Sequence, residues 1–165
     1  MATQLKNLSD FSNTQLPEAA DFTFAIVVSQ WNDEITNALY QGAVDFLLKY
    51  HAVSENILTI HVPGSYELSA AADMILTYKK VDAVICLGCV IQGETRHFDF
   101  ICNAVANGLT QITIKHNKPV VFGVLTTDSL LQAQERSGGK HGNKGEEAAA
   151  TAIQMAVLHR SLAQN

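Results

Sequence analysis

Four short apolar runs, separated by longer segments with a helical period, constrain this fold more than any other feature of the chain. The runs cover residues 22–30, 56–62, 82–91 and 119–127. Each carries apolar side chains at both odd and even positions. A strand that is apolar on both faces is typical of a parallel sheet covered by helices on each side. The pattern therefore predicts an α/β fold, a flavodoxin-like three-layer sandwich around a four-stranded parallel sheet with helices on both faces.

The segments between and after the runs are predicted to be helical. They cover residues 32–50, 65–79, 97–116 and 146–162. In the first, apolar residues such as Ile35 and Leu39 recur at the spacing of one helix face. A short helix after the fourth strand is expected to be capped by Thr127 or Asp128. Glycines in the stretch 138–145 are expected to interrupt the chain before the last helix.

The first 21 residues differ in composition from the rest of the chain. They are polar, contain Pro17 and show no hydrophobic period, so we expect a flexible N-terminal arm (1–21) followed by a single domain (22–165). The arm lacks the apolar stretch of a secretory signal. No apolar run approaches the roughly 20 residues of a membrane span. These features predict a cytoplasmic protein with no membrane contact.

Charged residues are scarce, at 16% of the chain against roughly 25% in ordinary globular proteins. Eleven Lys and Arg against sixteen Asp and Glu give a net charge of −5, and no basic stripe is visible. Nucleic acid is therefore not an expected partner. Low charge also indicates that other copies cover part of the surface, so we expect a homo-oligomer.

The three cysteines give no disulfide framework. Cys86 and Cys89 form a C-x-x-C pair, but they lie in a predicted strand, where residues three apart point to opposite faces. We predict that they are small buried or cleft-lining residues. The six histidines show no ligand-like spacing, so no metal site is predicted. No Walker loop and no G-x-G-x-x-G after a strand is present, and no cofactor is expected.

Polar loops follow the four predicted strands. They cover residues 30–32, 63–67, 92–97 and 126–128. Ligands of parallel sheets bind beyond the carboxyl ends of the strands, so all four loops are expected to form one cleft. Trp31 is either a core residue or a flat platform for a heterocycle. Gly93, Glu94 and Thr95 precede a helix and suit an anion, and His97 suits proton transfer near neutral pH.

Each of these side chains also has an ordinary structural interpretation. A histidine or an acid at a helix start is often solvated, and Glu67 would then only favour the helix dipole. Arg136, Lys140 and Lys144 lie near the glycine-rich turn. They are either part of a phosphate site or exposed residues at a helix end.

Four motifs carry a family resemblance, and the two long ones are highly specific. They are VPGSYEL (62–68), DAVICLGCVIQGETRHFDFI (82–101), NGL (107–109) and FGVLTTDSLLQAQERSGGKHGNKGEEAAATAIQM (122–155). With them the chain resembles the 6,7-dimethyl-8-ribityllumazine synthase family over residues 20–160. The resemblance implies a transferase that condenses 5-amino-6-(D-ribitylamino)uracil with 3,4-dihydroxy-2-butanone 4-phosphate and releases phosphate and water. This is the penultimate step of riboflavin biosynthesis.

The resemblance also implies roles for individual residues. The pyrimidine and its ribityl chain would be held by Trp31, Ser65, Tyr66, Glu67, Cys89, Val90, Ile91, Phe122 and Lys144, with Phe122 coming from a neighbouring subunit. The butanone phosphate would be held by Glu94, Thr95 and, from across the interface, Arg136. His97 matches the proton-transfer residue. Most family members have Phe in place of Trp31. They commonly have Arg in place of Gln92, and because that positive charge is missing here, phosphate affinity is expected to be lower.

The family's sites lie between adjacent subunits of a pentamer, and some members assemble twelve pentamers into a 60-subunit icosahedral shell. Members that stay pentameric often carry extra residues before the last helix. The turn SGGKHGNKG (137–145) has no insertion, so a shell is expected here. The resemblance also allows riboflavin synthase as a partner. The alternatives are a related ribitylpyrimidine enzyme and a non-catalytic flavin- or lumazine-binding shell protein, and the presence of Thr95, His97 and Arg136 argues against both.

Overall fold

The predicted strands pair in parallel at the centre of the fold. The computed structural model of the chain describes residues 7–11 and 15–164. Its main strands are β1 (Phe24–Ser29), β2 (Ile57–Val62), β3 (Ala83–Ile91) and β4 (Val120–Thr127). Their order is β2-β1-β3-β4, with every pair parallel. Every residue of β1 is buried, which confirms a sheet covered on both faces.

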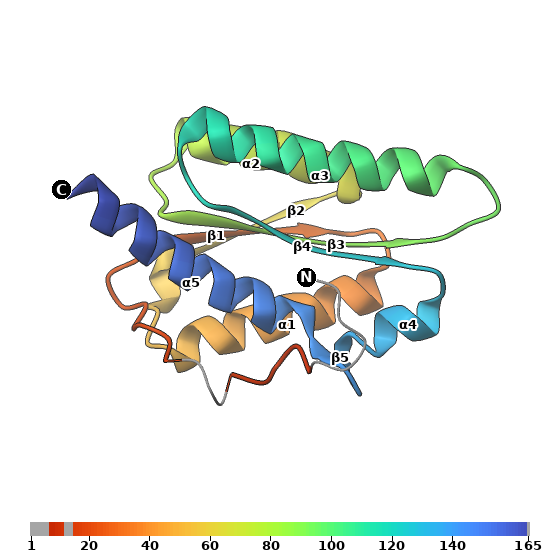
Figure 1. The fold of residues 1–165 in the computed structure, drawn as a ribbon, viewed down its shortest axis with the longest axis horizontal. Helices are drawn as coiled ribbons and strands as arrows, with labels where there is room; N and C mark the ends of the chain where they lie inside the picture. The colour runs from red at the N-terminus through yellow and green to blue at the C-terminus, as the bar shows by residue number, and fades with distance from the viewer. Residues whose placement is uncertain (1–6, 12–14, 165) are drawn as a thin grey trace.

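Helices cover both faces of this sheet. They are α1 (Asp33–Lys49), α2 (Leu68–Tyr78), α3 (His97–His116), α4 (Leu130–Gln134) and α5 (Lys144–Ala163). In Figure 1, α2 and α3 lie on one side of the sheet, and α1 and α5 lie on the other. Each face has its own core: Ile26 packs in the core that contains Leu39, and Val27 packs in the core that contains Leu109. The three-layer sandwich is therefore confirmed.

Some predicted helix starts were wrong. The cap of α4 is neither Thr127 nor Asp128: Thr127 still pairs with Ile91 in the sheet, and Ser129 Oγ accepts the backbone N–H of Gln132 at 3.3 Å. The chain thus needs two more residues to leave the sheet before it can turn. The predicted helix over 65–79 begins with a 3-10 turn at Ser65–Glu67.

The glycine-rich stretch before α5 folds into a short hairpin. Its strands are β5 (Ser137–Gly139) and β6 (Gly142–Asn143), paired antiparallel. Gly138 and Gly142 have φ angles of 121° and 81°, which glycine adopts without steric cost. The predicted interruption is confirmed, and α5 starts at Lys144, two residues earlier than expected.

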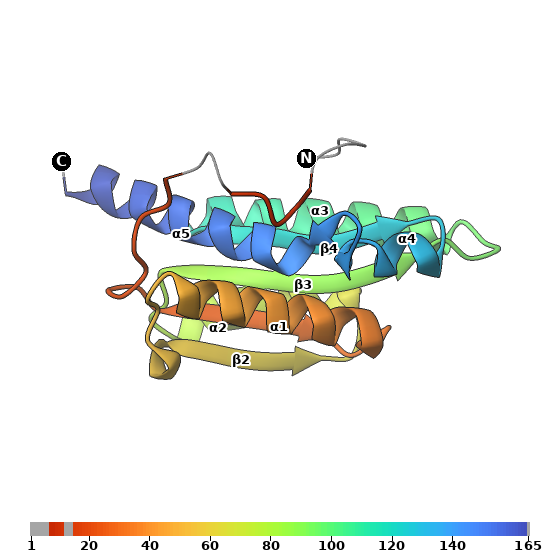
Figure 2. The ribbon, with the colours of Figure 1, turned by 90° about the horizontal axis from the view of Figure 1, so that it is seen from below.

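The described part of the N-terminal segment lies along α1 and the hairpin. The Phe11 ring lies 4.8 Å from the Phe46 ring, and the backbone N–H of Leu8 donates to the carbonyl of His141 at 2.7 Å. Figure 2 looks onto the face that carries α1, α5 and this segment. Residues 1–6 and 12–14 of the predicted arm lie outside the described residues. Across the described chain, no helix is both long and apolar enough to cross a membrane.

Candidate active site

A cleft of about 430 Å³ opens at the carboxyl ends of β1, β2 and β3, within the usual size range of small-molecule sites. Its lining residues are Trp31, Asn32, Gly64, Ser65, Tyr66, Cys89, Val90, Ile91, Gly93, Thr95, His97, Phe98 and Ile101. The prediction that the polar stretch after β3 forms one wall is confirmed. All four loops emerge at this edge, as predicted, and the backbone N–H of Gln92 donates to the Thr127 carbonyl at 2.8 Å. Residues 126–128, after β4, do not line the cleft, so only three of the four loops form its wall.

The loop after β1 presents a flat ring to the cleft. Trp31 is 71% exposed, so it is not a core residue. The next residue, Asn32, adopts a left-handed conformation with φ 59°, which asparagine tolerates better than most residues. Its Nδ2 donates to the carbonyl of Cys89 at 3.0 Å and ties this loop to the end of β3. Asn32 was missed as a site residue, and the signal was an asparagine between a strand end and a helix start.

The loop after β2 brings a buried, unpaired hydroxyl to the cleft. Ser65 is only 6% exposed, and its Oγ has no hydrogen-bond partner among the described residues. A Cβ on Gly88 would lie 2.6 Å from this Oγ, so the absence of a side chain there lets the loop approach β3. An unpaired buried hydroxyl is costly. A polar ligand in the cleft would satisfy it.

Tyr66 and Glu67, the other predicted site residues of this loop, lie in different positions relative to the cleft. Tyr66 lines the cleft and is 60% exposed, and its ring is therefore free to contact a ligand. Glu67 is not part of the lining. A Cβ on Gly64 would lie 3.1 Å from Glu67 Oε2, which places this carboxylate beside a residue that does line the cleft.

The loop between β3 and α3 is organised by its own polar groups. Gln92 Nε2 donates to the carbonyl of Gly93 at 2.7 Å, and the backbone N–H of His97 donates to Thr95 Oγ1 at 3.4 Å. Because α3 begins at His97, its positive dipole end lies at the cleft. Thr95 and His97 line the cleft, whereas Glu94 lies in the same loop without lining it. The wall thus combines an anion-favouring helix start with an imidazole.

The C-x-x-C pair divides between the two faces of the sheet, as predicted. Cys86 packs in the core beneath α2 and α3, and Cys89 packs in the core on the α1 side and also lines the cleft. Burial raises the pKa of Cys89 to about 11 and raises that of Cys86 further above its ordinary value. Both thiols are therefore protonated near neutral pH. The interpretation as buried and lining residues is confirmed.

Two apolar residues of α3, Phe98 and Ile101, were missed as cleft residues. Their spacing places them on the same helix face as Val105 and Leu109, which are buried. In the structure the first turn of α3 lies at the carboxyl ends of the strands (Figure 1), and these residues line the cleft. Periodicity identified the face but not what the face contacts.

Phe122, Arg136 and Lys144 lie outside the cleft of their own chain. Phe122 is on β4, in an apolar groove with Leu109, Ile114 and other residues of α3 and β4. Arg136 follows α4, and its backbone carbonyl accepts the N–H of Lys144 at 2.9 Å. The two cationic residues are thus neighbours at the base of the hairpin.

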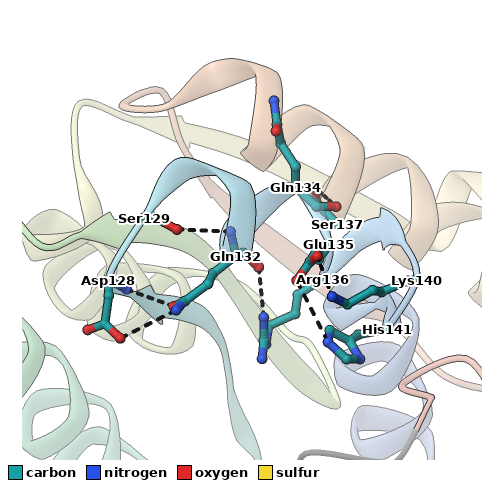
Figure 3. Close-up of polar contacts among 9 residues, drawn as sticks. All are labelled: Asp128, Ser129, Gln132, Gln134, Glu135, Arg136, Ser137, Lys140 and His141. Carbon is teal, nitrogen blue, oxygen red and sulfur yellow. Dashed lines mark hydrogen bonds and ion pairs between the residues drawn. The ribbon is translucent and has the colours of Figure 1, made fainter.

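The charges around the hairpin are unequally paired, and Figure 3 shows the contacts of Lys140 and Arg136. Lys140 Nζ lies 2.6 Å from Glu135, and Lys144 Nζ lies 3.1 Å from Glu147. The bond from Lys140 lowers the pKa of Glu135 below its ordinary value. Arg136 Nη1 donates instead to the carbonyl of Gln132 at 2.9 Å. Its charge also helps to lower the pKa of Glu135, but it forms no salt bridge with a carboxylate among the described residues. Arg136 is therefore the cation of this cluster best able to bind an anion.

No group of three His, Cys, Asp or Glu side chains within the described part of the chain could hold a metal ion. Fold and cleft together define an α/β protein with a small-molecule site at the carboxyl ends of a parallel sheet. The site pairs an exposed aromatic platform with an anion-favouring loop.

Comparison with known proteins gives the family. The family model described as 6,7-dimethyl-8-ribityllumazine synthase matches residues 21–160. A protein of that name from Cytophaga hutchinsonii is 58% identical over 94% of this chain and 97% of its own. Another from Porphyromonas gingivalis is 49% identical over 97% of this chain and 99% of its own. The chain belongs to the 6,7-dimethyl-8-ribityllumazine synthase family and is a transferase.

Proposed function

We propose that the cleft condenses 5-amino-6-(D-ribitylamino)uracil with 3,4-dihydroxy-2-butanone 4-phosphate to give 6,7-dimethyl-8-ribityllumazine. The observation that carries this assignment is the meeting of Trp31, the unpaired Ser65 hydroxyl, Thr95 and His97 in one cleft of a chain that belongs to this family. An aromatic platform suits the planar pyrimidine. A helix start suits the phosphate, and the Thr95 hydroxyl, which accepts the His97 N–H, can still donate to it.

The chemistry needs proton transfers but no covalent bond to the protein. The 5-amino group attacks the ketone, and water leaves as the imine forms. Loss of the C3 proton with the C4 phosphate gives an enol, which tautomerises to a ketone. The ribitylamino nitrogen attacks that ketone, and a second water leaves as the ring closes. His97 is the cleft residue best suited to carry the C3 proton.

Most of the acceleration is assigned to positioning. Two reactants held in near-attack geometry can supply about 7–11 kcal/mol of the barrier without a covalent catalyst. In this proposal Trp31 and Tyr66 hold the pyrimidine, while Ser65 and Glu67 bind the ribityl chain and ring edge. Cys89, Val90 and Ile91 form the floor. Glu94 and Thr95 face the phosphate.

A neighbouring subunit completes the site in this proposal. Phe122, Arg136 and Lys144 lie outside the cleft of their own chain, and Arg136 forms no salt bridge with a carboxylate among the described residues. Ile114 is 75% exposed and Leu131 is 64% exposed. Apolar side chains exposed beside β4 and on α4 are typical of a surface covered by another subunit. We therefore propose a pentamer in which one subunit's Arg136 reaches its neighbour's phosphate loop.

We further propose that pentamers assemble into an icosahedral shell, because the short hairpin before α5 carries no insertion. Sedimentation under native conditions tests this. A particle of shell mass is expected. Sedimentation at pentamer mass would refute the shell and leave the shared site intact, whereas a monomer with full activity would contradict the shared site itself.

Replacing His97 with alanine is expected to slow turnover without abolishing it. General acid–base catalysis contributes at least about 10²-fold, so kcat should fall by about that factor while the KM values of both substrates change little. Steady-state kinetics with each substrate varied in turn measures both effects. Activity no faster than the protein-free reaction would contradict the positioning account.

Replacing Gln92 with arginine is expected to lower the KM for the butanone phosphate about threefold or more, since a cation beside the phosphate adds a charge-assisted contact. Gln92→Ala is the control, because it removes the bond to the Gly93 carbonyl without adding charge. An unchanged or higher KM for the arginine variant would contradict this prediction.

The proposed reaction is tested by mixing both substrates with the protein and following lumazine absorbance and fluorescence against a protein-free control. Acceleration is expected with the butanone phosphate and should vanish with the butanone that lacks the phosphate. Protein that binds the pyrimidine but gives no acceleration would identify a lumazine- or flavin-binding shell instead.

A further inference from the structure

Asn143, the last residue of β6, lies at the junction of α1, the hairpin and α5. It is only 7% exposed. Its side-chain Oδ1 accepts the N–H of Gly145 at 2.8 Å, and its Nδ2 donates to the carbonyls of Ala38 at 2.9 Å and Ser137 at 3.4 Å. Its backbone N–H donates to Ser9 Oγ at 2.9 Å. One amide group therefore links three elements.

The orientation of this amide is determined by its partners. Gly145 offers a donor, and the two carbonyls can only accept, so the oxygen must face Gly145 and the nitrogen must face Ala38 and Ser137. The amide also packs closely against α1, because it occupies the space beside Gly42 where an added Cβ would lie 2.5 Å from Asn143 Nδ2. The amide is therefore held in one orientation by its hydrogen bonds.

The groups held by this amide adjoin the two cationic residues. Ser137 directly follows Arg136, and Lys144 directly follows Asn143. The backbone N–H of Lys144 also donates to the Arg136 carbonyl at 2.9 Å. The position of the Arg136 backbone, and with it the direction of the Arg136 side chain, is therefore linked to the Asn143 side chain through short backbone contacts.

We infer that Asn143 is a positioning residue, which holds Arg136 so that it can reach the phosphate in the neighbouring subunit's cleft. This inference rests on the proposed function, in which Arg136 binds that phosphate. Charge-assisted contacts from a guanidinium fork depend strongly on geometry, and a displacement of about 1 Å can cost about 10²-fold in rate. Asn143 does not line the cleft of its own chain, and it acts through the hairpin.

A single substitution separates this role from simple helix capping. Asn143→Asp keeps an oxygen for the Gly145 N–H, and aspartate caps helices as well as asparagine does. It removes both N–H donors and places a carboxylate against the carbonyls of Ala38 and Ser137. If Asn143 served only as the cap of α5, this variant would behave as the wild type.

The experiment compares the wild type with Asn143→Asp, Asn143→Ser and Arg136→Ala. Asn143→Ser retains a smaller oxygen for capping and adds no charge. Ser137→Ala is the matched control, because it alters a side chain of the same hairpin but leaves the Ser137 carbonyl in place. Each protein is assayed for both KM values, kcat, inhibition by inorganic phosphate and melting temperature.

The expected result is selective. In both Asn143 variants the KM for the butanone phosphate and the inhibition constant of inorganic phosphate should rise about tenfold, while the KM for the pyrimidine changes less than about twofold. Ser137→Ala should resemble the wild type. Equal loss for both substrates in proportion to melting temperature, or failure of both Asn143 variants to fold, would make the role structural and overturn the inference.

The same data distinguish this inference from the proposed function. If phosphate inhibition weakens in Arg136→Ala but not in the Asn143 variants, only the positioning role is overturned. If Arg136→Ala also leaves phosphate inhibition unchanged, the phosphate role of Arg136 fails, and the inference fails with it.

Discussion

Replacing Arg136 with alanine is expected to lower kcat/KM for the butanone phosphate by about 10³-fold. Two charge-assisted hydrogen bonds to the phosphate contribute roughly 4 kcal/mol together, and each 1.36 kcal/mol corresponds to about tenfold in rate. The guanidinium is available for this role because its contact in the isolated chain is the Gln132 carbonyl at 2.9 Å. Steady-state kinetics with saturating pyrimidine measures the effect.

Lys140→Ala is the matched control for Arg136→Ala. Lys140 also lies on the hairpin segment, but it is exposed and paired with Glu135 at 2.6 Å, and such surface pairs contribute about 0–1 kcal/mol. Its kcat/KM should stay within about threefold of the wild type. A comparable loss in both variants would indicate general attraction of the anion rather than a specific contact. Complete inactivation by both Arg136→Ala and His97→Ala would contradict the positioning account.

Replacing Gly145 with alanine is expected to destabilise the fold by about 3 kcal/mol, the upper end of the usual range for overpacking. Gly145 is buried in the first turn of α5, where an added Cβ would collide with the carbonyl oxygen of Leu39 on α1 and lie 2.7 Å from its carbon. Neither backbone can yield without separating the two helices, and overpacking of this kind typically costs about 1–3 kcal/mol. The melting temperature should fall by about 6–12 °C.

Gly93→Ala provides the control for the stability measurement. A Cβ on Gly93 would meet nothing within 4 Å, so its melting temperature should change by no more than about 2 °C. Both variants are compared with the wild type at one subunit concentration, because association also stabilises the folded state. A Gly145→Ala protein that melts like the wild type would show that α1 and α5 can separate without cost.

The alternation of apolar runs and helical periods predicted the sheet and its covering helices, because both signals are local. A side chain's face in a strand or helix follows from its position in the repeat. Ile26 and Val27 illustrate this, since adjacent residues of one strand enter different cores. Parallel pairing follows in turn, because two buried faces require helices on both sides.

The cap of α4 is a feature that local sequence signals did not predict. Thr127, Asp128 and Ser129 are all good capping residues, and the sequence does not rank them. The choice depends on where β4 leaves the sheet, and Thr127 still pairs with Ile91 on β3. The end of that pairing is a property of two strands far apart in the chain.

Two aromatic residues show the same limit within the site. Trp31 was compatible with a core position, the commoner one for tryptophan, and with a platform, and the fold leaves it 71% exposed at the cleft. Phe98 shares a helix face with the buried residues of α3. It lines the cleft because α3 begins at the carboxyl ends of the strands. Hydrophobicity predicts that a side chain will form apolar contacts, but it does not predict which residues or ligands it will contact.

The fold class, the family motifs and the loops that carry polar side chains could all be predicted from the amino-acid sequence. Three features of the site depend on three-dimensional packing: three of those loops share a cleft, Ser65 is left unpaired in its wall, and Arg136 lies outside it. Periodicity and turn chemistry act over a few residues and can be inferred from the chain alone. Which loops meet, and which hydroxyl is left unpaired, depends on how distant strands and helices pack.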